Sequence, residues 1–408
     1  MPKKNSRAFK SNFVANNEIF GYLADEDKHL LRPIEAEYKF NIIGAGLMGQ
    51  EHMQVTLQEG RGCIHGVYDP KPASIEQFKR RLAKFGTADK LIEYDTLEAA
   101  CNDPEVDGLI IATPNYTHCE VVGIAARSGK HILLEKPMAT TLQDAFTIKK
   151  IAENYKAVFQ VGLQYRYKAI YVEAIYEALR RKALGDIKMV NMVEHRPPFL
   201  DKVNQWNKFS EYSGGTLIEK CCHYFDLLNL FAQSRPVTVH ANGSRAVNFI
   251  DFEYSDAKSD ILDNAQVTVV YENGVIGSFN LCMFSPQTYE ELVICGDEGR
   301  LKASENIDHL QSPRPRNTLE IMCGESKPSR ISNPGYLSYI EQSGHSGATF
   351  YEHSHFIDNI AGKETSTATA DEGYWSVVVG AAAEASVKTG DIIKIDDFLE
   401  KEGISTET

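Results

Sequence analysis

A glycine-rich turn between an apolar strand and a helix constrains the fold of this chain more than any other feature. Residues 38–43 read YKFNII and predict a strand. The residues that follow match the pattern G-x-G-x-x-G: Gly44, Ala45, Gly46, Leu47, Met48 and Gly49. Here Gly44 would permit a tight turn, Gly46 a close approach to a pyrophosphate, and Gly49 close packing of helix on strand. A lone match is weak, but its place between a strand and a helix predicts a dinucleotide site.

Short apolar strands alternate with amphipathic helices from residue 38 to about residue 162. Apolar runs such as residues 108–112 are typical of strands buried on both faces, so this region predicts a parallel sheet between helices. After residue 163 the expected strands are longer, and tight turns such as Asn273-Gly274 join them. We therefore predict an α/β protein with an N-terminal Rossmann domain and a C-terminal α/β domain that has a large, mainly antiparallel open sheet.

These patterns divide the chain into four segments. Residues 1–36 are polar and without a clear period, so we interpret them as an N-terminal arm. We assign residues 37–162 to the Rossmann domain that binds NAD, and residues 163–345 to a domain for substrate binding and oligomerisation. Residues 346–408 are expected to form C-terminal helices that pack back on the core.

Charge and composition exclude several classes of partner. The formal net charge of −13 argues against nucleic acid or an anionic membrane surface. The longest weakly polar run, residues 374–387, contains Glu384 and is shorter than the roughly 20 apolar residues of a membrane helix. No apolar secretory segment begins the chain, and the eight cysteines are scattered as expected of reduced thiols. We therefore expect a cytoplasmic protein without membrane or nucleic-acid partners.

The residue that ends the second expected strand bears on the choice between NAD and NADP. Asp69 could accept hydrogen bonds from both ribose hydroxyls and would repel a 2′-phosphate. Alternatively, Asp69 only starts the turn before Pro70, and the positive charge of Lys71 could soften the discrimination. We expect NAD as the cofactor, with NADP less favoured.

Two further stretches follow apolar strands at the edge where such sheets bind ligands. One is ATPNYTH, residues 112–118, and the other is LLEKPMA, residues 133–139. In the second, Glu135 and Lys136 place a carboxylate and an ammonium at the rim, and Pro137 ends the strand. A solvated ion pair without function is the alternative interpretation.

The stretch GGTLIEKCCHYFDLL, residues 214–228, has the period of one amphipathic helix. Its apolar residues, among them Leu217 and Phe225, form one face, whereas Glu219, His223 and Asp226 recur on the other. His223 could be a general base, because the pKa of histidine lies near neutrality. It could also be a core histidine that Asp226 or a backbone carbonyl satisfies.

Together these motifs resemble the Gfo/Idh/MocA oxidoreductase family. The resemblance covers roughly residues 38–390 and rests on GAGLMG, ATPNYTH, EKP, GLQYRY and the pattern G-G-x-x-x-[D/E]-x-x-x-H-x-x-D. It implies a Rossmann domain and a second domain whose open sheet often forms the oligomer interface, so we expect a homodimer or homotetramer. The implied activity is NAD-dependent oxidation of a secondary hydroxyl of a cyclic polyol or sugar derivative.

The resemblance also implies roles for single residues. Lys136 matches the active-site lysine and His223 the acid/base histidine, while Glu219 stands where many members have aspartate. One extra methylene at Glu219, and the neighbouring Lys220-Cys221-Cys222, mark where this chain departs from the family and where its substrate preference is expected to reside. Residues on the cofactor side are expected to be the glycine motif and Asp69, Thr113, Pro114, Asn115, His118, Glu135 and Lys136.

From this chemistry we expect His223 to accept the hydroxyl proton and Lys136 to stabilise the developing alkoxide. Glu219 would orient the imidazole and act as the third catalytic residue, while Asp226 is assigned to structure and Cys222 stays ambiguous. Glu219, His223, Asp226 and Cys222 could also form a metal site. We expect no metal, because Lys136 already supplies the positive charge.

A polyol or pyranose needs many polar partners and an apolar face. Candidates on the substrate side, besides Glu219 and His223, are Tyr165, Arg166, Arg196, Asn204, Trp206, His345 and His353. Each could equally be a packing or surface residue. Two other functions stay open: glycoside cleavage through transient oxidation by bound NAD, and a non-catalytic ligand or cofactor sensor.

Overall fold

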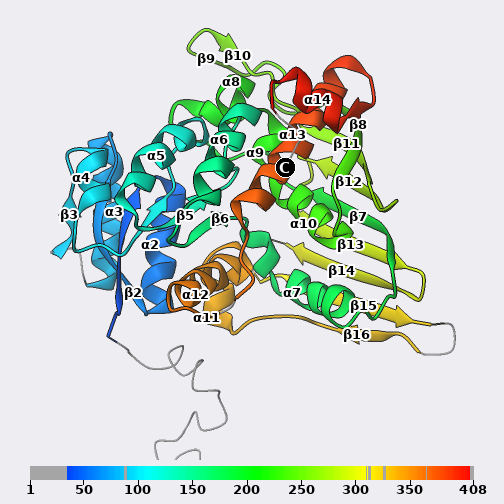
Figure 1. Cartoon of the computed structure of the whole chain (residues 1–408), viewed down its shortest axis with the longest axis horizontal. Coiled ribbons are helices and arrows are strands. Elements are labelled where there is room, and N and C mark those ends of the chain that lie inside the picture. Colours follow the sequence, from blue (N-terminus) through cyan, green and yellow to red (C-terminus); the bar gives the residue numbers. More distant parts are fainter. Residues whose placement is uncertain are drawn as a thin grey trace, which may run out of the picture.

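The computed structural model describes residues 35–86, 90–308, 310, 314–324, 328–363 and 365–404. Except for its last two residues, the N-terminal arm predicted from the sequence lies outside the described residues. Two sheets dominate the described part, with helices between and around them (Figure 1). None of the described helices is both long and apolar enough to cross a membrane.

The first sheet has six parallel strands in the order β3-β2-β1-β4-β5-β6. Its strands are β1 (Tyr38–Ile43), β2 (Gly62–Tyr68), β3 (Ile92–Glu93), β4 (Gly108–Ile111), β5 (His131–Glu135) and β6 (Phe159–Gly162). Its helices are α2 (Leu47–Glu59), α3 (Pro72–Leu82), α4 (Leu97–Asn102), α5 (His118–Ala125) and α6 (Leu142–Glu153). The strand order reverses between β1 and β4, so the carboxyl ends of these strands border a ligand crevice.

Local sequence explains where these elements begin. The four residues of β4 are all apolar or glycine and all buried, as expected of a central parallel strand. Proline at the first turn starts α3, and threonine hydroxyls cap α4 and α6 by accepting backbone hydrogen bonds. Of these starts, the sequence predicts that of α6 at Leu142; α3 begins two residues before the predicted helix, and the sequence does not predict α4.

The glycines of the predicted turn meet three different steric demands. Gly44 has φ +102°, and a Cβ there would lie 2.6 Å from the carbonyl oxygen of Ala112. A Cβ on Gly49 would lie 1.9 Å from the carbonyl oxygen of Gly44, so helix α2 crosses the turn at backbone contact. A Cβ on Gly46 would meet no atom within 4 Å. The strand, turn and helix therefore have the geometry that the pattern requires.

The second sheet has nine strands in the order β16-β15-β14-β13-β7-β12-β11-β8-β17. All neighbours are antiparallel except β12 and β7. Its strands are β7 (Ile187–His195), β8 (Pro236–Ser244), β11 (Asn264–Tyr271), β12 (Ile276–Cys282), β13 (Thr288–Gly296), β14 (Gly299–Ile307), β15 (Arg316–Cys323), β16 (Arg330–Ser332) and β17 (Ile393–Lys394). The short pair β9 (Glu253–Tyr254) and β10 (Ala257–Lys258) stands apart. The predicted α/β fold class is confirmed.

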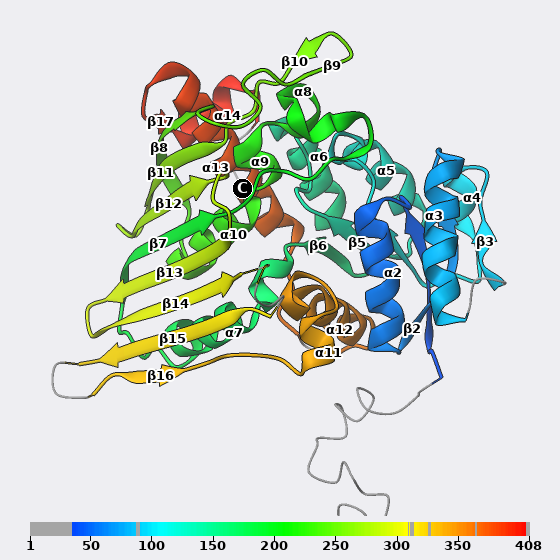
Figure 2. The same ribbon diagram turned by 180° about the vertical axis from the view of Figure 1, so that it is seen from behind.

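Helices cover one face of this sheet and connect it to the first (Figure 2). The remaining helices are α7 (Ala169–Ile175), α8 (Ser210–Ser213), α9 (Thr216–Glu219), α10 (Cys222–Ala232), α11 (Ser338–Glu341), α12 (Ala348–Ile360), α13 (Ala370–Thr389) and α14 (Ile395–Lys401). Helix α10 packs on β7 and β12, while α13 contacts β8, α10 and α6. Helix α12 packs on α2 of the first domain. The C-terminal helices therefore join the two domains.

The stretch from Gly214 to Leu228 is not the single helix that its period predicts. Helix α9 ends at Glu219, and α10 begins at Cys222. At the break, the N–H of Cys221 donates to the carbonyl of Thr216, five residues earlier. The carbonyl of Glu219 instead accepts a hydrogen bond from Lys136 Nζ. This contact with another domain, which periodicity cannot reveal, corrects the prediction.

A buried ion pair joins the segment after β6 to helix α10. Arg166 donates to both carboxylate oxygens of Asp226, at 2.6 and 2.5 Å, and both side chains are almost fully buried. The third guanidinium nitrogen of Arg166 contacts Glu372 of α13 at 2.8 Å. Asp226 therefore has the structural role expected of it. The structure also corrects the placement of Arg166 on the substrate side, because its guanidinium is engaged within the protein.

Replacement of Asp226 by asparagine should lower the free energy of unfolding by about 3 kcal/mol, because it leaves the buried guanidinium with the partly exposed Glu372 as its remaining charge partner. Urea unfolding followed by circular dichroism measures the change. Asp186→Asn, in an exposed pair with Lys188, is the control and should change stability by less than about 1 kcal/mol. Equal effects of the two variants would contradict the assigned role.

The steric roles of the glycines predict that two similar substitutions change the free energy of unfolding by different amounts. Gly49→Ala should destabilise the protein by about 1–3 kcal/mol, because its Cβ meets backbone atoms. Gly46→Ala should change the free energy of unfolding by less than about 0.5 kcal/mol, because its Cβ enters open space. The same urea experiment measures both, and a stable Gly49→Ala protein would refute the packing argument.

Candidate active site

The crevice at the carboxyl ends of β1 and β4 has the features of a dinucleotide site. Gly46 is the N-cap of helix α2 and provides no side-chain cap, so no side chain satisfies the N–H groups at the positive end of the helix there. The open space over Gly46 lets a phosphate approach the backbone. Beyond β4, the buried Asn115 has an Nδ2 donor without a partner among the residues that the structure describes. These features fit a nicotinamide dinucleotide.

Asp69 follows β2, as predicted, and shapes the turns around it. One oxygen accepts the N–H of Ala45, and the other accepts the N–H of Lys71, both at 2.8 Å. Each carboxylate oxygen can accept a further hydrogen bond, so Asp69 keeps capacity for a ribose. Lys71 Nζ contacts Asn204 Oδ1 at 3.3 Å, which places the 203–208 segment next to this end of the crevice.

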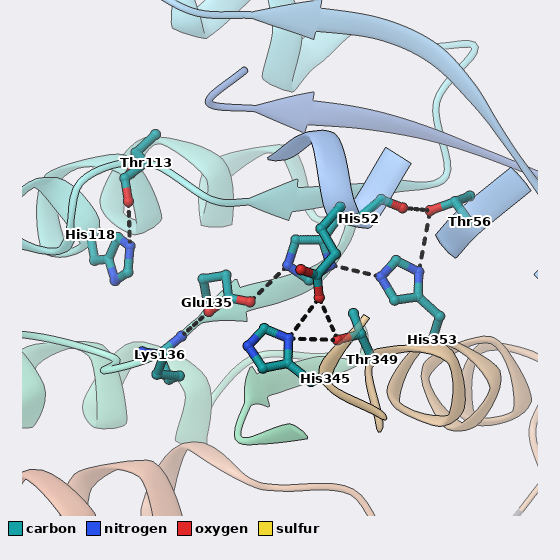
Figure 3. Close-up of polar contacts among 10 residues, drawn as sticks. His52, Thr56, Thr113, His118, Glu135, Lys136, His345, Thr349 and His353 are labelled. Atoms are coloured by element: carbon teal, nitrogen blue, oxygen red, sulfur yellow. Dashed lines mark hydrogen bonds and ion pairs between the residues drawn. The ribbon is translucent and has the colours of Figure 1, made fainter. Parts of the chain in front are cut away.

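Thr113, Pro114 and Asn115 follow β4 at the rim, whereas His118 does not face the crevice. The ring of His118 is fully buried, with Nδ1 2.9 Å from the carbonyl of Pro137. Its Nε2 lies 3.1 Å from the carbonyl of Thr113 (Figure 3). His118 therefore joins two rim loops and positions the turn after Lys136. This engagement corrects its assignment as a cofactor contact.

Lys136 stands directly after β5, next to Glu135. Its backbone N–H donates to Glu135 Oε2 at 2.9 Å, and its Nζ lies 3.3 Å from the carbonyl of Glu219. Burial favours the neutral amine, but the negative charges of Glu219 and Glu135 outweigh it and raise the pKa of Lys136. Lys136 is therefore a cation at neutral pH.

Glu219 is buried but ionised. Burial acts to raise the pKa of its carboxyl, yet Lys202 and Lys136 lower this pKa to about 2. Its carboxylate accepts a hydrogen bond from Lys202 Nζ at 3.2 Å. Within the described part of the chain, no hydrogen bond joins Glu219 to His223. The structure therefore corrects the expectation that Glu219 orients the imidazole, because the break after α9 carries its side chain toward Lys202.

Tyr165 orients His223 instead. The two rings are stacked, with centroids 4.0 Å apart and planes at 7°. His223 is 1% exposed, and its Nδ1 has no partner among the described residues. Burial, with the positive charges of Lys136 and Lys220, holds the pKa of His223 well below its ordinary value. The imidazole is therefore neutral at pH 7 and can accept a proton.

The residues that depart from the family pattern lie in the same cluster. Lys220 Nζ donates to the hydroxyl of Tyr165 at 2.7 Å and forms an ion pair with Glu194 at 3.0 Å. Cys222 is fully buried, and burial raises the pKa of its thiol to about 12, so it is no nucleophile. Sequence reasoning noted Lys220 as a departure but missed Glu194, which comes from β7.

The remaining substrate-side candidates separate into two regions. Asn204 and Trp206 line an open pocket of about 460 Å³ together with Tyr116, Phe209, Glu211, Tyr212, Tyr254, Ser255 and Ala257. Lys136, Glu219 and His223 are not among its lining residues. Arg196 lies nearer to Lys220, because its Nη1 is 3.7 Å from Glu194, the carboxylate that pairs with Lys220.

His353 of α12 and His345, in the turn just before α12, both contact helix α2. His345 Nδ1 lies 2.7 Å from Glu51 Oε1, and the His345 ring is 6.3 Å from that of Tyr165. His353 is buried against His52, at 2.8 Å between ring nitrogens, so its assignment to the substrate side is wrong. Sequence reasoning missed His52 and Glu51, for which only their place on α2 was a signal.

Among the described residues, His223 is not part of a group of side chains placed to bind a metal ion. The group of three ligand atoms within 4.8 Å of one another comes from His52, Glu352 and His353. Glu219, His223 and Asp226, which the sequence offered as a possible ligand set, do not form such a group. Asp226 is engaged by Arg166, and Glu219 by Lys202.

Comparison with known proteins gives the same fold. Myo-inositol 2-dehydrogenase of Thermotoga maritima is 21% identical over 364 residues, 88% of this chain and 99% of that protein. The scyllo-inositol 2-dehydrogenase (NAD(+)) of Bacillus subtilis is 24% identical, over 89% of this chain and 98% of that protein. The structure of levoglucosan dehydrogenase with NADH superposes with a TM-score of 0.73 at 18% identity, covering 88% of this chain and 99% of that chain.

Two family models together match most of the sequence. The one for an oxidoreductase family with an NAD-binding Rossmann fold matches residues 38–163. The one for the C-terminal alpha/beta domain of that family matches residues 176–395. The chain therefore belongs to the Gfo/Idh/MocA family of NAD-binding oxidoreductases.

Proposed function

We propose that this oxidoreductase oxidises a secondary hydroxyl of a cyclic polyol or sugar derivative. The observation that carries the proposal is that Lys136 Nζ reaches the carbonyl of Glu219, at the break before the helix that carries the buried His223. Lys136 can stabilise negative charge on an alcohol oxygen, and His223 can accept its proton.

NAD, when bound, supplies the acceptor for the hydride that leaves the carbinol carbon. The backbone at Gly46 and the start of α2 would hold its pyrophosphate. Asp69 would accept hydrogen bonds from a ribose, and Asn115 Nδ2 would donate to the nicotinamide end. Glu135 and Lys136 border the same end of the crevice.

The side chains of this protein handle the proton. As the C–H bond breaks and the C=O bond forms, the hydroxyl proton passes to His223. Lys136 donates a hydrogen bond to the same oxygen and stabilises its alkoxide character. Glu219 keeps Lys136 charged, and Tyr165 keeps the imidazole plane fixed by stacking. The sum of these changes is a ketone, a reduced cofactor and a protonated His223.

The substrate class rests on the relatives and on the polarity of the site. Names among the relatives specify myo-inositol and scyllo-inositol, and a structural neighbour is a levoglucosan dehydrogenase. All three substrates are cyclic and rich in hydroxyls. Lys202 beside Glu219, Arg196 beside Glu194 and Tyr165 against His223 offer the donors and acceptors that such a ring needs.

The activity can be tested with a panel of inositols, hexoses and anhydrosugars in the presence of NAD. Formation of reduced cofactor with a cyclic polyol is expected, and Lys136→Ala and His223→Ala should each lower kcat by about 10²–10⁴. Both variants should fold, as circular dichroism will show. Saturable NAD binding without net reduction of NAD by any substrate would contradict this function and favour the redox-neutral alternative.

The depressed pKa of His223 predicts the pH dependence. Because the base must be neutral, kcat/KM for oxidation should stay constant as pH falls to the ordinary histidine value of 6.5 and decline only below it. Lys220→Met removes one positive charge and should move this acidic limb to higher pH. A limb above pH 6.5 in the unmodified enzyme would contradict a buried neutral base.

A further inference from the structure

The carboxylate next to Lys136 is held from two sides. Glu135 is 3% exposed, and its Oε2 accepts the backbone N–H of Lys136 at 2.9 Å. Its Oε1 lies 2.8 Å from Nε2 of His52, a fully buried residue of α2 (Figure 3). Lys136 therefore contacts the same carboxylate that His52 holds on its far side.

His52 is itself held by the C-terminal helix α12. Its Nδ1 lies 2.8 Å from Nε2 of His353, and Nδ1 of His353 lies 3.2 Å from the hydroxyl of Thr56. That hydroxyl also contacts the carbonyl of His52 at 2.8 Å. Both histidines are at most 1% exposed. A continuous chain of contacts thus runs from Thr56 through two imidazoles to Glu135.

Hydrogen-bond chemistry sets the direction of the chain at Glu135. An ionised carboxylate can only accept, so Nε2 of His52 must carry the proton of that contact. Either Nδ1 of His52 accepts from His353, whose Nδ1 accepts the hydroxyl proton of Thr56, and both rings are neutral, or the Thr56 hydroxyl donates to the carbonyl of His52 and the two rings share one positive charge. In both arrangements Nε2 of His52 donates to Glu135. This hydrogen bond therefore forms whether or not the two imidazoles carry a positive charge.

A shared metal ion is a poorer account of the two histidines. His52, His353 and Glu352 could offer three ligand atoms, and neither carboxylate oxygen of Glu352 has a partner in the described residues. However, two nitrogens bound to one tetrahedral zinc at about 2.0–2.1 Å would lie roughly 3.3 Å apart. The observed 2.8 Å is the length of a hydrogen bond.

We propose that His52, supported by His353, is a positioning residue for substrate oxidation: its N–H fixes the Glu135 carboxylate, and Glu135 fixes Lys136 against the reacting oxygen. The inference rests on the proposed function. It extends the site through α2 to α12, so that the C-terminal segment contributes to the placement of Lys136. Thr56, His353 and His52 are not placed in contact with the substrate. Their effect on the reaction passes through Glu135.

Two amide variants of His52 separate the two ends of its ring. In His52→Gln the side-chain N–H₂ can occupy the place of Nε2 and still donate to Glu135. In His52→Asn the shorter amide reaches the place of Nδ1, so the contact with His353 survives and that with Glu135 is lost. Both variants remove the imidazole and leave a neutral amide, so they are matched in chemistry and differ in reach.

The test compares kcat for the best cyclic polyol in these variants. His52→Asn should lower kcat about tenfold or more at nearly unchanged KM, because a small displacement of Lys136 is sufficient to slow the reaction. His52→Gln should recover kcat to within about threefold of the unmodified enzyme. His355→Gln, on the helix α12 that carries His353 but with its ring against Tyr167, is the control and should match the unmodified enzyme.

The pH dependence of kcat distinguishes the proposed role from a loss of packing, because poorer packing alone would not shift it. The groups that face Glu135 are His52, Lys136, His345, Glu51 and Glu352, and the hydrogen bond from His52 lowers the pKa of its carboxyl. His52→Asn should therefore raise the pKa of Glu135 and add its protonation to the acidic limb that His223 sets, whereas His52→Gln should leave the profile of kcat unchanged. Thermal unfolding midpoints of the two variants should agree within a few degrees.

Equal kcat values and pH profiles for His52→Asn and His52→Gln would overturn the inference, as would one equivalent of tightly bound zinc lost on His353→Gln. The contact itself is read without turnover, by NMR of protein labelled with ¹⁵N-histidine. A slowly exchanging Nε2–H signal should vanish in His52→Asn and shift in Glu135→Gln. If that signal is present but no polyol is oxidised, the proposed function fails while the His52–Glu135 contact stands.

Discussion

A buried ammonium group needs nearby negative charge, and the site is arranged around that requirement at Lys136. Removal of a charge from water is unfavourable unless partners compensate it. Glu135 and Glu219 supply the compensation, and each is held by a different part of the chain. Glu135 is held by His52 of the Rossmann domain, whereas Glu219 is held by Lys202 of the second domain. The charge state and position of Lys136 therefore depend on both domains being correctly packed.

The charges around the site give Lys136 and His223 different protonation states. Carboxylates keep Lys136 protonated, while lysines and burial keep His223 neutral. A pair of groups with pKa values pushed in opposite directions is how an enzyme assigns acid and base roles near neutral pH. Tyr165 connects the base to one of the lysines that keep it neutral, since it stacks on His223 and accepts a hydrogen bond from Lys220.

Sequence reasoning succeeds here where the relevant contacts are local. The turn from Gly44 to Gly49, the strand that ends at Glu135 and the alternation of strands and helices could all be predicted, because each depends on residues close in the chain. The break after Glu219 could not, because it accompanies a hydrogen bond from Lys136, 83 residues away. His52 and His353 are 301 residues apart, and each alone resembles an ordinary buried histidine. Long-range pairing of polar groups leaves no periodic signal in sequence.

A crystal structure with NADH and the preferred polyol tests the central claim most directly. If Lys136 and His223 act as proposed, one hydroxyl oxygen lies within hydrogen-bond distance of both Lys136 Nζ and the imidazole of His223. The carbon bearing this hydroxyl then faces the nicotinamide. A polyol bound instead among Tyr116, Asn204 and Trp206, with neither Lys136 nor His223 in contact, would contradict the account.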